Sequence, residues 1–386
     1  MKAVICGAGI SGLSLAWWLA RDGWDVTLVE RAPGPREEGY MIDFFGSGFD
    51  AADRMGLLPR LREVAYTVHE VVFEDGQGRP KARLSYDDFR RALKGRLLSM
   101  MRGDIERVLF AALPEQVTIR WGATIAEIRN SPRGVRVTLG DGKVLEADLL
   151  AGADGIHSQV RERIFGPARQ FVRDLGFRTA AYLFDDPAIA PRLGGDFPLV
   201  SVPRRTVGLY PLRDGRIASF FVHAGRDDPR PADPARVLRD VYGSLGWCVP
   251  AALAHAGDTP IYYDMVAQVE MPNWRKDRVV LLGDACAAVS LLAGQGASMG
   301  FAMAHVLAEE LRRGGDIGKA LARYEKRLKG ELAKKQKAGR QTASSLVPVN
   351  RRQLLMRNLA LRAARLPLLR WLLMPLFLSG SESFIR

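Results

Sequence analysis

The chain has 386 residues, of which 47% are hydrophobic and 26% are charged, and its formal net charge is +13. These values are typical of a globular protein with two or three domains and a large core. Three distant cysteines without a CxxC pair and five histidines without an HExxH pair argue against a disulfide framework and a metal site. The excess positive charge lies in residues 312–386, with 18 Lys/Arg and four Asp/Glu, so the neutral remainder argues against nucleic-acid binding.

The first 30 residues predict a strand, a glycine-rich turn, a helix and a second strand. Residues 2–6 are apolar, and the turn Gly7-Ala8-Gly9-Ile10-Ser11-Gly12 follows them. Residues 13–21 have a helical composition, and residues 25–30 form a second strand that ends in an acid. Because Met1 leads directly into the first strand, we expect no signal or transit peptide and a cytoplasmic protein.

This order of elements is typical of a dinucleotide site. Gly7 permits the tight turn, Gly9 lets a pyrophosphate approach the backbone, and Gly12 lets helix and strand pack closely. Glu30, at the end of the second strand, can accept a hydrogen bond from a ribose hydroxyl. A purely structural strand–helix–strand turn is the alternative, because glycine-rich turns are common.

Short strands and helices are expected over the next hundred residues. Gly39-Tyr-Met-Ile-Asp43, followed by Gly46-Ser-Gly48, reads as a glycine-rich surface loop. The pattern predicts strands within 68–84 around an Asp75-Gly76 turn, a helix at 102–113, and a β-meander at 117–128, 134–139 and 143–146.

A buried strand at 148–152 leads into Asp154-Gly155 and a helix that begins near Ser158. Alone, this is ordinary turn chemistry with Ser158 as the helix N-cap. From about 168 to 272, strand-length runs separated by Pro and Gly predict a separate antiparallel sheet. Its expected elements are strands at 177–184, 197–202, 206–211, 217–223 and 261–269 and a helix at 235–245.

A third glycine motif follows the apolar run 278–282. The run ends at Gly283-Asp284, and Gly294-Gln295-Gly296 then opens a helix. Backbone N–H groups at a helix start, without nearby Cβ atoms, suit close approach by a polar ligand. A glycine-rich turn without a ligand would have the same local sequence.

Together, the three motifs resemble those of the FAD-dependent aromatic hydroxylases, the single-component flavoprotein monooxygenases with the p-hydroxybenzoate hydroxylase fold. The chain looks most like polyketide-tailoring hydroxylases and tetracycline-inactivating monooxygenases, over about residues 1–315. The resemblance implies that the first motif holds the FAD pyrophosphate and that Glu30 binds the adenosine ribose. The Asp-Gly motif would serve FAD and NAD(P)H, and the Gly-Asp motif would contact the ribityl chain and the flavin ring.

Other positions also match the family. Arg102 resembles an arginine that contacts the flavin nucleotide, with a solvated helix end as the alternative. Ile125 matches a strand position beside the adenine, and residues 39–48 resemble the mobile segment beside the isoalloxazine ring. The cofactor-binding residues implied by the resemblance are Gly7, Gly9, Ile10, Ser11, Gly12, Glu30, Arg31, Arg102, Ile125, Asp154, Asp284, Gly294, Gln295, Gly296, Ala297 and Ser298.

The resemblance implies an α/β (α+β) fold with a Rossmann-type FAD-binding domain, an inserted antiparallel-sheet substrate domain and a C-terminal helical extension. The expected FAD-binding domain comprises 1–67, 98–167 and 273–315, and the substrate domain comprises 68–97 and 168–272.

The basic region 316–386 is expected to begin with a long helix, to about residue 345, and to cap both domains. Its apolar stretch 366–378 is too short to span a bilayer, and a surface membrane anchor is the alternative to a cap. We expect a monomer or a dimer.

The implied function is that of an FAD-dependent monooxygenase. FAD would be bound tightly but not covalently, and NADPH or NADH would act as a transient co-substrate. O₂ would then give a flavin C4a-hydroperoxide that hydroxylates an aromatic or polyketide-like small molecule. Two alternatives remain, namely an FAD-dependent dehydrogenase or reductase of a similar molecule without oxygen insertion, and a non-catalytic FAD-bound partner protein.

No residue pattern identifies a catalytic group. His223 and Tyr210, in the expected antiparallel sheet, are candidates for a base that deprotonates the substrate, and packing is the alternative for both. The third motif also departs from the family pattern, so we expect an unusual wall on the substrate side of the flavin. The departures are Cys286 for an alanine, Ala287 for a histidine, Leu291 for a proline, Ser298 for an asparagine and Met303 for an aspartate.

Overall fold

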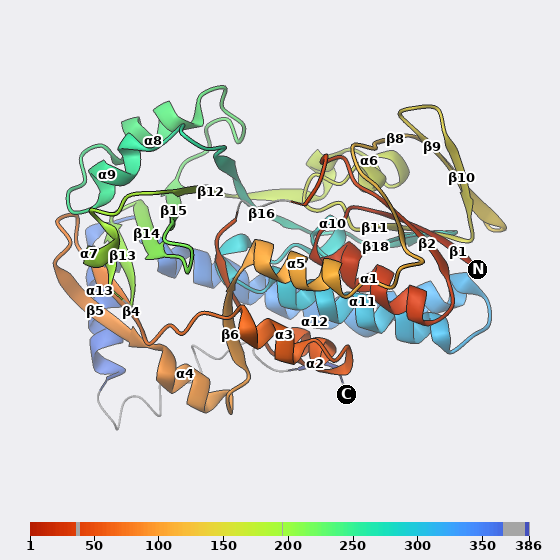
Figure 1. The fold of residues 1–386 in the computed structure, drawn as a ribbon, viewed down its shortest axis with the longest axis horizontal. Coiled ribbons are helices and arrows are strands. Elements are labelled where there is room, and N and C mark those ends of the chain that lie inside the picture. Colours follow the sequence, from red (N-terminus) through yellow and green to blue (C-terminus); the bar gives the residue numbers. More distant parts are fainter. Residues whose placement is uncertain (36–38, 195, 366–382, 386) are drawn as a thin grey trace.

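The computed structural model describes residues 1–35, 39–194, 196–365 and 383–385. Within these ranges, six strands form the first sheet, in the order β17-β18-β11-β1-β2-β7 (Figure 1). All neighbouring strands run parallel except β17 and β18. β11 is buried along its whole length, as expected for a strand covered on both faces. The strands are β1 (Lys2–Cys6), β2 (Asp25–Val29), β7 (Thr118–Arg120), β11 (Leu149–Gly152), β17 (Arg275–Lys276) and β18 (Val279–Leu281).

Helices and a small sheet cover this parallel sheet. α1 (Ile10–Arg21) packs against α5 (Arg102–Ala111) and α11 (Gly296–Arg312), and α11 packs against α12 (Ile317–Leu346). The antiparallel strands β8 (Ile125–Ser131), β9 (Gly134–Leu139) and β10 (Val144–Ala147) lie beside β1 and β11. The expected meander is therefore shorter than predicted, because Thr118–Arg120 pairs with β2 in the large sheet instead.

Seven strands of the described chain form the second sheet, in the order β16-β12-β15-β14-β13-β4-β5. Neighbouring strands in this sheet run antiparallel, except for the parallel pair β13 and β4. The helices α7 (Ala190–Leu193), α8 (Pro234–Tyr242) and α9 (Val249–Ala254) pack on one face, and the other face is turned toward the first sheet (Figure 1). The strands are β4 (Glu70–Glu74), β5 (Pro80–Ser85), β12 (Val172–Phe184), β13 (Phe197–Val202), β14 (Arg205–Pro211), β15 (Ile217–Ala224) and β16 (Tyr262–Val269).

The segment predicted as a glycine-rich surface loop has regular structure. It forms β3 (Met41–Phe45), which pairs with β6 (Leu97–Met101), and the start of α2 (Ser47–Arg54). Ile42 and Phe44 are buried, so tertiary packing overrides the glycine signal here. The remaining helices are α3 (Leu58–Glu63), α4 (Tyr86–Ala92), α6 (Gln159–Ile164), α10 (Asp284–Ala287) and α13 (Arg351–Ala363). The architecture as a whole is the predicted α/β fold with a second, mainly antiparallel sheet.

The basic C-terminal part begins within the main core. Leu321, Tyr324 and Leu328 of α12 are fully buried there, and at its far end the Leu346 carbonyl accepts a hydrogen bond from Thr206 of the second sheet. Across the described ranges, no helix is both long and apolar enough to cross a bilayer. The stretch 366–378, for which we predicted a cap or a membrane anchor, lies outside the described residues.

Candidate active site

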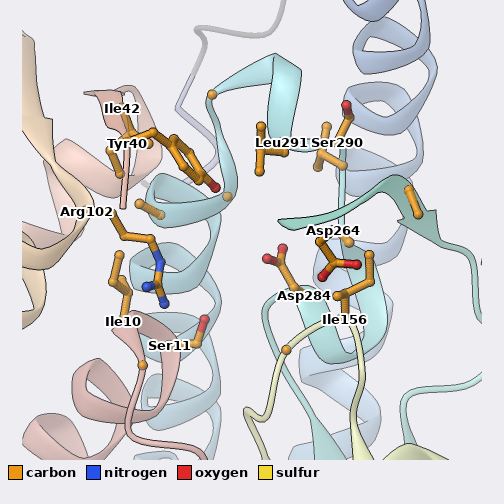
Figure 2. A pocket seen from close by; sticks show the side chains of 18 of the residues that line it. Ile10, Ser11, Tyr40, Ile42, Arg102, Ile156, Asp264, Asp284, Ser290 and Leu291 are labelled. Atoms are coloured by element: carbon orange, nitrogen blue, oxygen red, sulfur yellow. The ribbon is translucent and has the colours of Figure 1, made fainter. Parts of the chain in front are cut away.

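A continuous cavity lies between the two sheets. Its larger part, about 450 Å³, adjoins the carboxyl ends of β1 and β2, and its smaller part, about 160 Å³, adjoins β16 (Figure 2). Gly9, Arg102 and Asp284 line both parts. In open α/β sheets, ligands bind outside the carboxyl ends of strands where the strand order reverses, and β1 lies at such a point, between β11 and β2.

The first glycine motif forms the floor of the cavity. Gly7 has φ +102°, which few other residues adopt, and a Cβ on Gly12 would overlap the Gly7 carbonyl oxygen. Gly9 is the N-cap of α1, and no described side chain caps this helix. Gly9 and the next two residues, Ile10 and Ser11, line the cavity. This helix start therefore suits an anionic group such as a pyrophosphate.

Glu30 lies at the edge of the larger part, where Arg31 and Ile125 also line the wall. The backbone N–H of Ala8 donates to one Glu30 carboxylate oxygen (2.8 Å), and that of Ala32 donates to the other (2.9 Å). These bonds fix the carboxylate at the end of β2. Because a carboxylate oxygen can accept more than one hydrogen bond, a ribose hydroxyl is compatible with this arrangement.

Arg102 is the cation at the centre of the cavity wall. Its Nη2 lies 2.6 Å from the Glu106 carboxylate, one turn further along α5. Burial lowers the pKa of Arg102, but the nearby groups Glu106, Tyr40, Tyr262 and Asp284 together outweigh it and the pKa is raised. Arg102 therefore stays charged and faces Asp284 across the cavity (Figure 2).

The Asp-Gly turn lines the cavity and also has a structural role. Both Asp154 carboxylate oxygens are used at the start of α6, where they accept hydrogen bonds from the Ser158 hydroxyl (2.5 Å) and the backbone N–H of Gln159 (2.7 Å). Arg161 is fully buried and donates to the carbonyls of Ile156 (2.6 Å) and Ala285 (2.9 Å). Arg161 thus joins the second motif to the third.

The third motif closes the cavity on the far side. Gly283 has φ +62° and precedes Asp284, whose side chain is exposed to the cavity. Partial loss of hydration inside the protein raises the pKa of Asp284, while Arg102 opposes the rise. Gly294, Gly296 and Ala297 line the smaller part at the start of α11. The free backbone N–H groups at this helix start can bind the polar edge of a flat ring, just as those at the start of α1 can bind a pyrophosphate.

Two of the predicted cofactor contacts point elsewhere. The Gln295 side chain accepts a hydrogen bond from the buried Lys335 ammonium of α12 (3.2 Å). The Ser298 hydroxyl accepts one from the Phe45 backbone N–H (3.3 Å) and so holds β3 against α11. These hydrogen bonds stabilise the turn on the side away from the cavity, and the neighbouring residues of the motif line the cavity wall.

Tyr40 and Tyr262, from two separate segments, are the aromatic residues in the described wall of the smaller part, and Phe220 packs against Tyr40. Tyr40 lies 5.6 Å from Phe220 and 6.2 Å from Tyr262, measured between ring centroids. Ile42 and Leu291 complete this apolar end (Figure 2). Burial raises the pKa values of Tyr40 and Tyr262, so both phenols stay neutral.

The two candidate bases are not in the cavity wall. His223 lies on the face of β15 that packs against α8, where its Nδ1 is 3.2 Å from the Tyr242 hydroxyl. Tyr210 lies on the opposite face, but its hydroxyl accepts a hydrogen bond from the Met41 backbone N–H (2.5 Å). The sequence does not say which face of β15 meets the cavity, because side chains alternate along a strand, so a catalytic role for His223 stays a prediction.

The structure instead brings an unpredicted pair to the wall. His157, in the Asp-Gly turn, has its Nε2 2.7 Å from a carboxylate oxygen of Asp264 in β16. Asp264 lines both parts of the cavity, and His157 lines the larger part. His157 was visible in the second motif, but its partner is 107 residues away, and no local signal connects them.

The wall residues fit FAD. The starts of two helices line the smaller part of the cavity, that of α1 suited to a pyrophosphate and that of α11 suited to a ring edge, and Tyr40 and Tyr262 lie in the same wall. The larger part adds Glu30, an acid suited to a ribose. The missing side chains at Gly7 and Gly12 leave the space that close approach of a dinucleotide requires.

Comparisons with known proteins agree with this geometry. The FAD binding domain family model matches residues 1–327. An uncharacterized protein of Mycobacterium tuberculosis (strain H37Rv) is 32% identical over 329 residues, which cover 81% of this chain and 85% of that protein. A flavin-dependent monooxygenase of Legionella longbeachae is 26% identical over 350 residues, covering 88% of each chain.

Solved structures show the same fold. The tetracycline destructase Tet(51) matches with a TM-score of 0.81 and 25% identity, covering 93% of this chain and 95% of its own. Klebsiella pneumoniae HpxO, complexed with FAD and uric acid, matches with a TM-score of 0.78 and 23% identity, covering 94% and 92%.

Proposed function

This chain belongs to the FAD binding domain family and is an FAD-dependent monooxygenase, and we propose that it uses NADPH or NADH and O₂ to hydroxylate an aromatic or polyketide-like small molecule. The proposed reaction converts substrate, O₂, NAD(P)H and one proton into hydroxylated substrate, NAD(P)⁺ and water. One oxygen atom enters a C–H bond, and the other leaves as water.

The observation that carries the proposal is the two-part cavity. A larger part, lined by residues of the first glycine motif, adjoins a small part whose wall includes the aromatic side chains of Tyr40 and Tyr262. A flat aromatic molecule would gain both apolar burial and ring contacts at that end. The relatives named as monooxygenases support the assignment of oxygen insertion over simple dehydrogenation.

In this assignment, Gly9, Ile10 and Ser11 would hold the pyrophosphate and Glu30 the adenosine ribose. Asp284 would bind the ribityl chain, and the backbone from Gly294 to Ala297 would meet the polar edge of the ring. When bound, FAD would supply electron transfer from the nicotinamide and activation of O₂. Tyr40, Ile42 and Leu291 would orient the substrate and exclude water from the reacting atoms.

The experiment is to load the purified protein with FAD and follow NADPH and NADH oxidation with a panel of phenols, naphthols and hydroxylated anthraquinones. We expect one or more compounds to accelerate oxidation and to gain 16 mass units, with the added oxygen derived from ¹⁸O₂. Acceleration without oxygen insertion would indicate a dehydrogenase, and failure to take up FAD would overturn the assignment.

A matched pair of variants tests the assigned FAD site. Asp284→Ala removes a carboxylate that lines both parts of the cavity, whereas Asp141→Ala removes one in the β9–β10 turn that lines neither part. We expect the first to weaken FAD binding by at least tenfold and the second to leave it unchanged.

A further inference from the structure

The proposed reaction takes one proton from solvent in each turnover, yet the small part of the cavity is lined mainly by buried side chains. Among the described residues in this wall, the titratable side chains are Tyr40, Arg102, Tyr262, Asp264 and Asp284. Burial raises the pKa values of Tyr40 and Tyr262, and Arg102 stays charged beside Glu106. None of these three is suited to accept and release a proton near neutral pH.

Asp264 and Asp284 are the two carboxylates in this wall (Figure 2). Asp284 lies at the start of α10, and its side chain is exposed to the cavity across from Arg102. Asp264 differs because one of its carboxylate oxygens lies 2.7 Å from His157 Nε2. Its other oxygen accepts a hydrogen bond from the Met265 backbone N–H (2.8 Å), which fixes the orientation of the carboxylate.

His157 reaches toward solvent. Its side chain is 25% exposed, while that of Asp264 is 10% exposed, so His157 is the more exposed member of the pair. The two residues come from different parts of the fold, His157 from the Asp-Gly turn and Asp264 from β16 of the second sheet. An imidazole has two ring nitrogens, so it can accept a proton at one while it donates a proton from the other.

We propose that His157 and Asp264 form the path by which protons pass between solvent and the flavin cavity. His157 takes a proton from water at its exposed side and donates Nε2–H to Asp264, and Asp264 passes the proton to the group reacting in the cavity. The reverse order returns a proton released by a phenolic substrate. This proposal rests on the proposed function, but its test needs only bound FAD and no substrate.

The test uses the uptake of a proton when the flavin is reduced. Two-electron reduction of FAD takes up at least one proton, so flash photoreduction of the FAD-loaded protein in weak buffer, followed with a pH-indicator dye, reports the proton-transfer rate. We expect His157→Gln and Asp264→Asn to slow proton uptake by tenfold or more, as for loss of a proton-transfer group. The extent of flavin reduction should be unchanged.

His255→Gln is the matched control. His255 also forms an ion pair, with its Nδ1 2.9 Å from Asp258, and its side chain is 32% exposed, but it lies on the far side of the second sheet at the end of α9. We expect proton uptake at the wild-type rate in this variant. His157→Ala adds a further check, because imidazole added to the solution should restore the rate through the exposed position.

The outcomes separate the two proposals. Wild-type proton uptake in both His157→Gln and Asp264→Asn would overturn the proton path. So would a slow rate accompanied by tenfold weaker FAD binding and no rescue by imidazole, because a structural role explains that result. Slow uptake with imidazole rescue, but no oxygen insertion into any substrate, would support the path and count against the proposed hydroxylation.

Discussion

The two parts of the cavity are built in different ways. In the larger part, backbone conformation and the missing side chains at Gly7 and Gly12 decide the shape, and one short stretch of chain supplies the floor. In the smaller part, side chains from separate segments meet, among them Tyr40, Tyr262 and Leu291. A backbone-built site tolerates few changes, whereas a wall of side chains can change its specificity without loss of the fold.

The largest expected effect tests the backbone-built part. A Cβ on Gly12 would overlap the Gly7 carbonyl oxygen, and neither backbone can move without disturbing the sheet. We expect Gly12→Ala to destabilise the protein by about 4 kcal/mol or more, at the upper end for single substitutions, and to abolish FAD binding. Urea unfolding and FAD titration would measure both effects. Gly330→Ala, in α12 where the backbone is not in the positive-φ region and a Cβ meets nothing within 4 Å, controls for the effect of the extra methyl group.

A second prediction concerns the link between the motifs. Arg161 is fully buried and its guanidinium donates to two carbonyls, one in the Asp-Gly turn and one in α10. Burial lowers the pKa of Arg161, which shows how strongly the site disfavours a charge without these bonds. Arg161→Leu leaves both carbonyls without this donor, and we expect a loss of about 3 kcal/mol in the free energy of unfolding.

Thermal and urea unfolding of the Arg161→Leu variant measure this loss. The adjacent Arg163 donates to the Ile125 carbonyl (2.8 Å) near the protein surface, so Arg163→Leu provides the control. A loss of similar size in both variants would show that the link between the motifs is no stronger than an ordinary surface hydrogen bond.

The difference between the two parts also explains what the sequence could and could not predict. The glycine motif, Glu30 and Asp284 were predictable because each depends on a few consecutive residues whose backbone requirement is visible locally. Several strands of the second sheet followed from strand-length runs, and the observed β13 has the predicted bounds. Their order in the sheet depends on pairing between distant segments, which these runs do not show.

The smaller part was harder because its residues depend on which face of a strand meets the cavity. Phe220 and Phe221 are neighbours in β15, yet Phe220 contacts Tyr40 near the cavity and Phe221 contacts Tyr242 on the opposite face. A shift of one residue in the predicted alternation of side chains along the strand would exchange its two faces. The pair of His157 and Asp264 was missed for a related reason, because the residues are distant in sequence and only the packing of the two sheets brings them together.

A third prediction tests the junction between the two parts. The Ser11 hydroxyl, at the start of α1, fills the space where a Cβ on Gly300 of α11 would lie, 2.5 Å away. We expect Gly300→Ala to cost about 2 kcal/mol through overpacking. Ser11→Ala removes the hydroxyl, so the double variant should recover most of that loss. A double variant no more stable than Gly300→Ala would mean that the two helices are held apart by other contacts.

The smallest expected effect is at His305 of α11, the helix whose start we assign to the polar edge of the flavin ring. Burial, together with the positive charge of Arg54, lowers the pKa of His305 to about 4. Arg54 Nη1 lies 2.7 Å from His305 Nε2, so the neutral imidazole accepts this hydrogen bond in the folded protein. Unfolding raises the pKa to its ordinary value of about 6.5, and the unfolded chain therefore binds more protons between these two pH values.

Stability must then rise with pH across this window, and it must fall as the pH drops from about 6.5 toward 4. We expect His305 to account for about 1 to 2 kcal/mol of that fall, less than the full pKa difference implies because solvent screens part of the interaction. His305→Gln keeps an acceptor for Arg54 but cannot be protonated. The difference in unfolding free energy between wild type and this variant, measured in urea from pH 4 to 7, should shrink toward low pH. A difference that is constant over the range would show that His305 is protonated equally in both states, and that α11 is no more tightly packed behind the ring than at the protein surface.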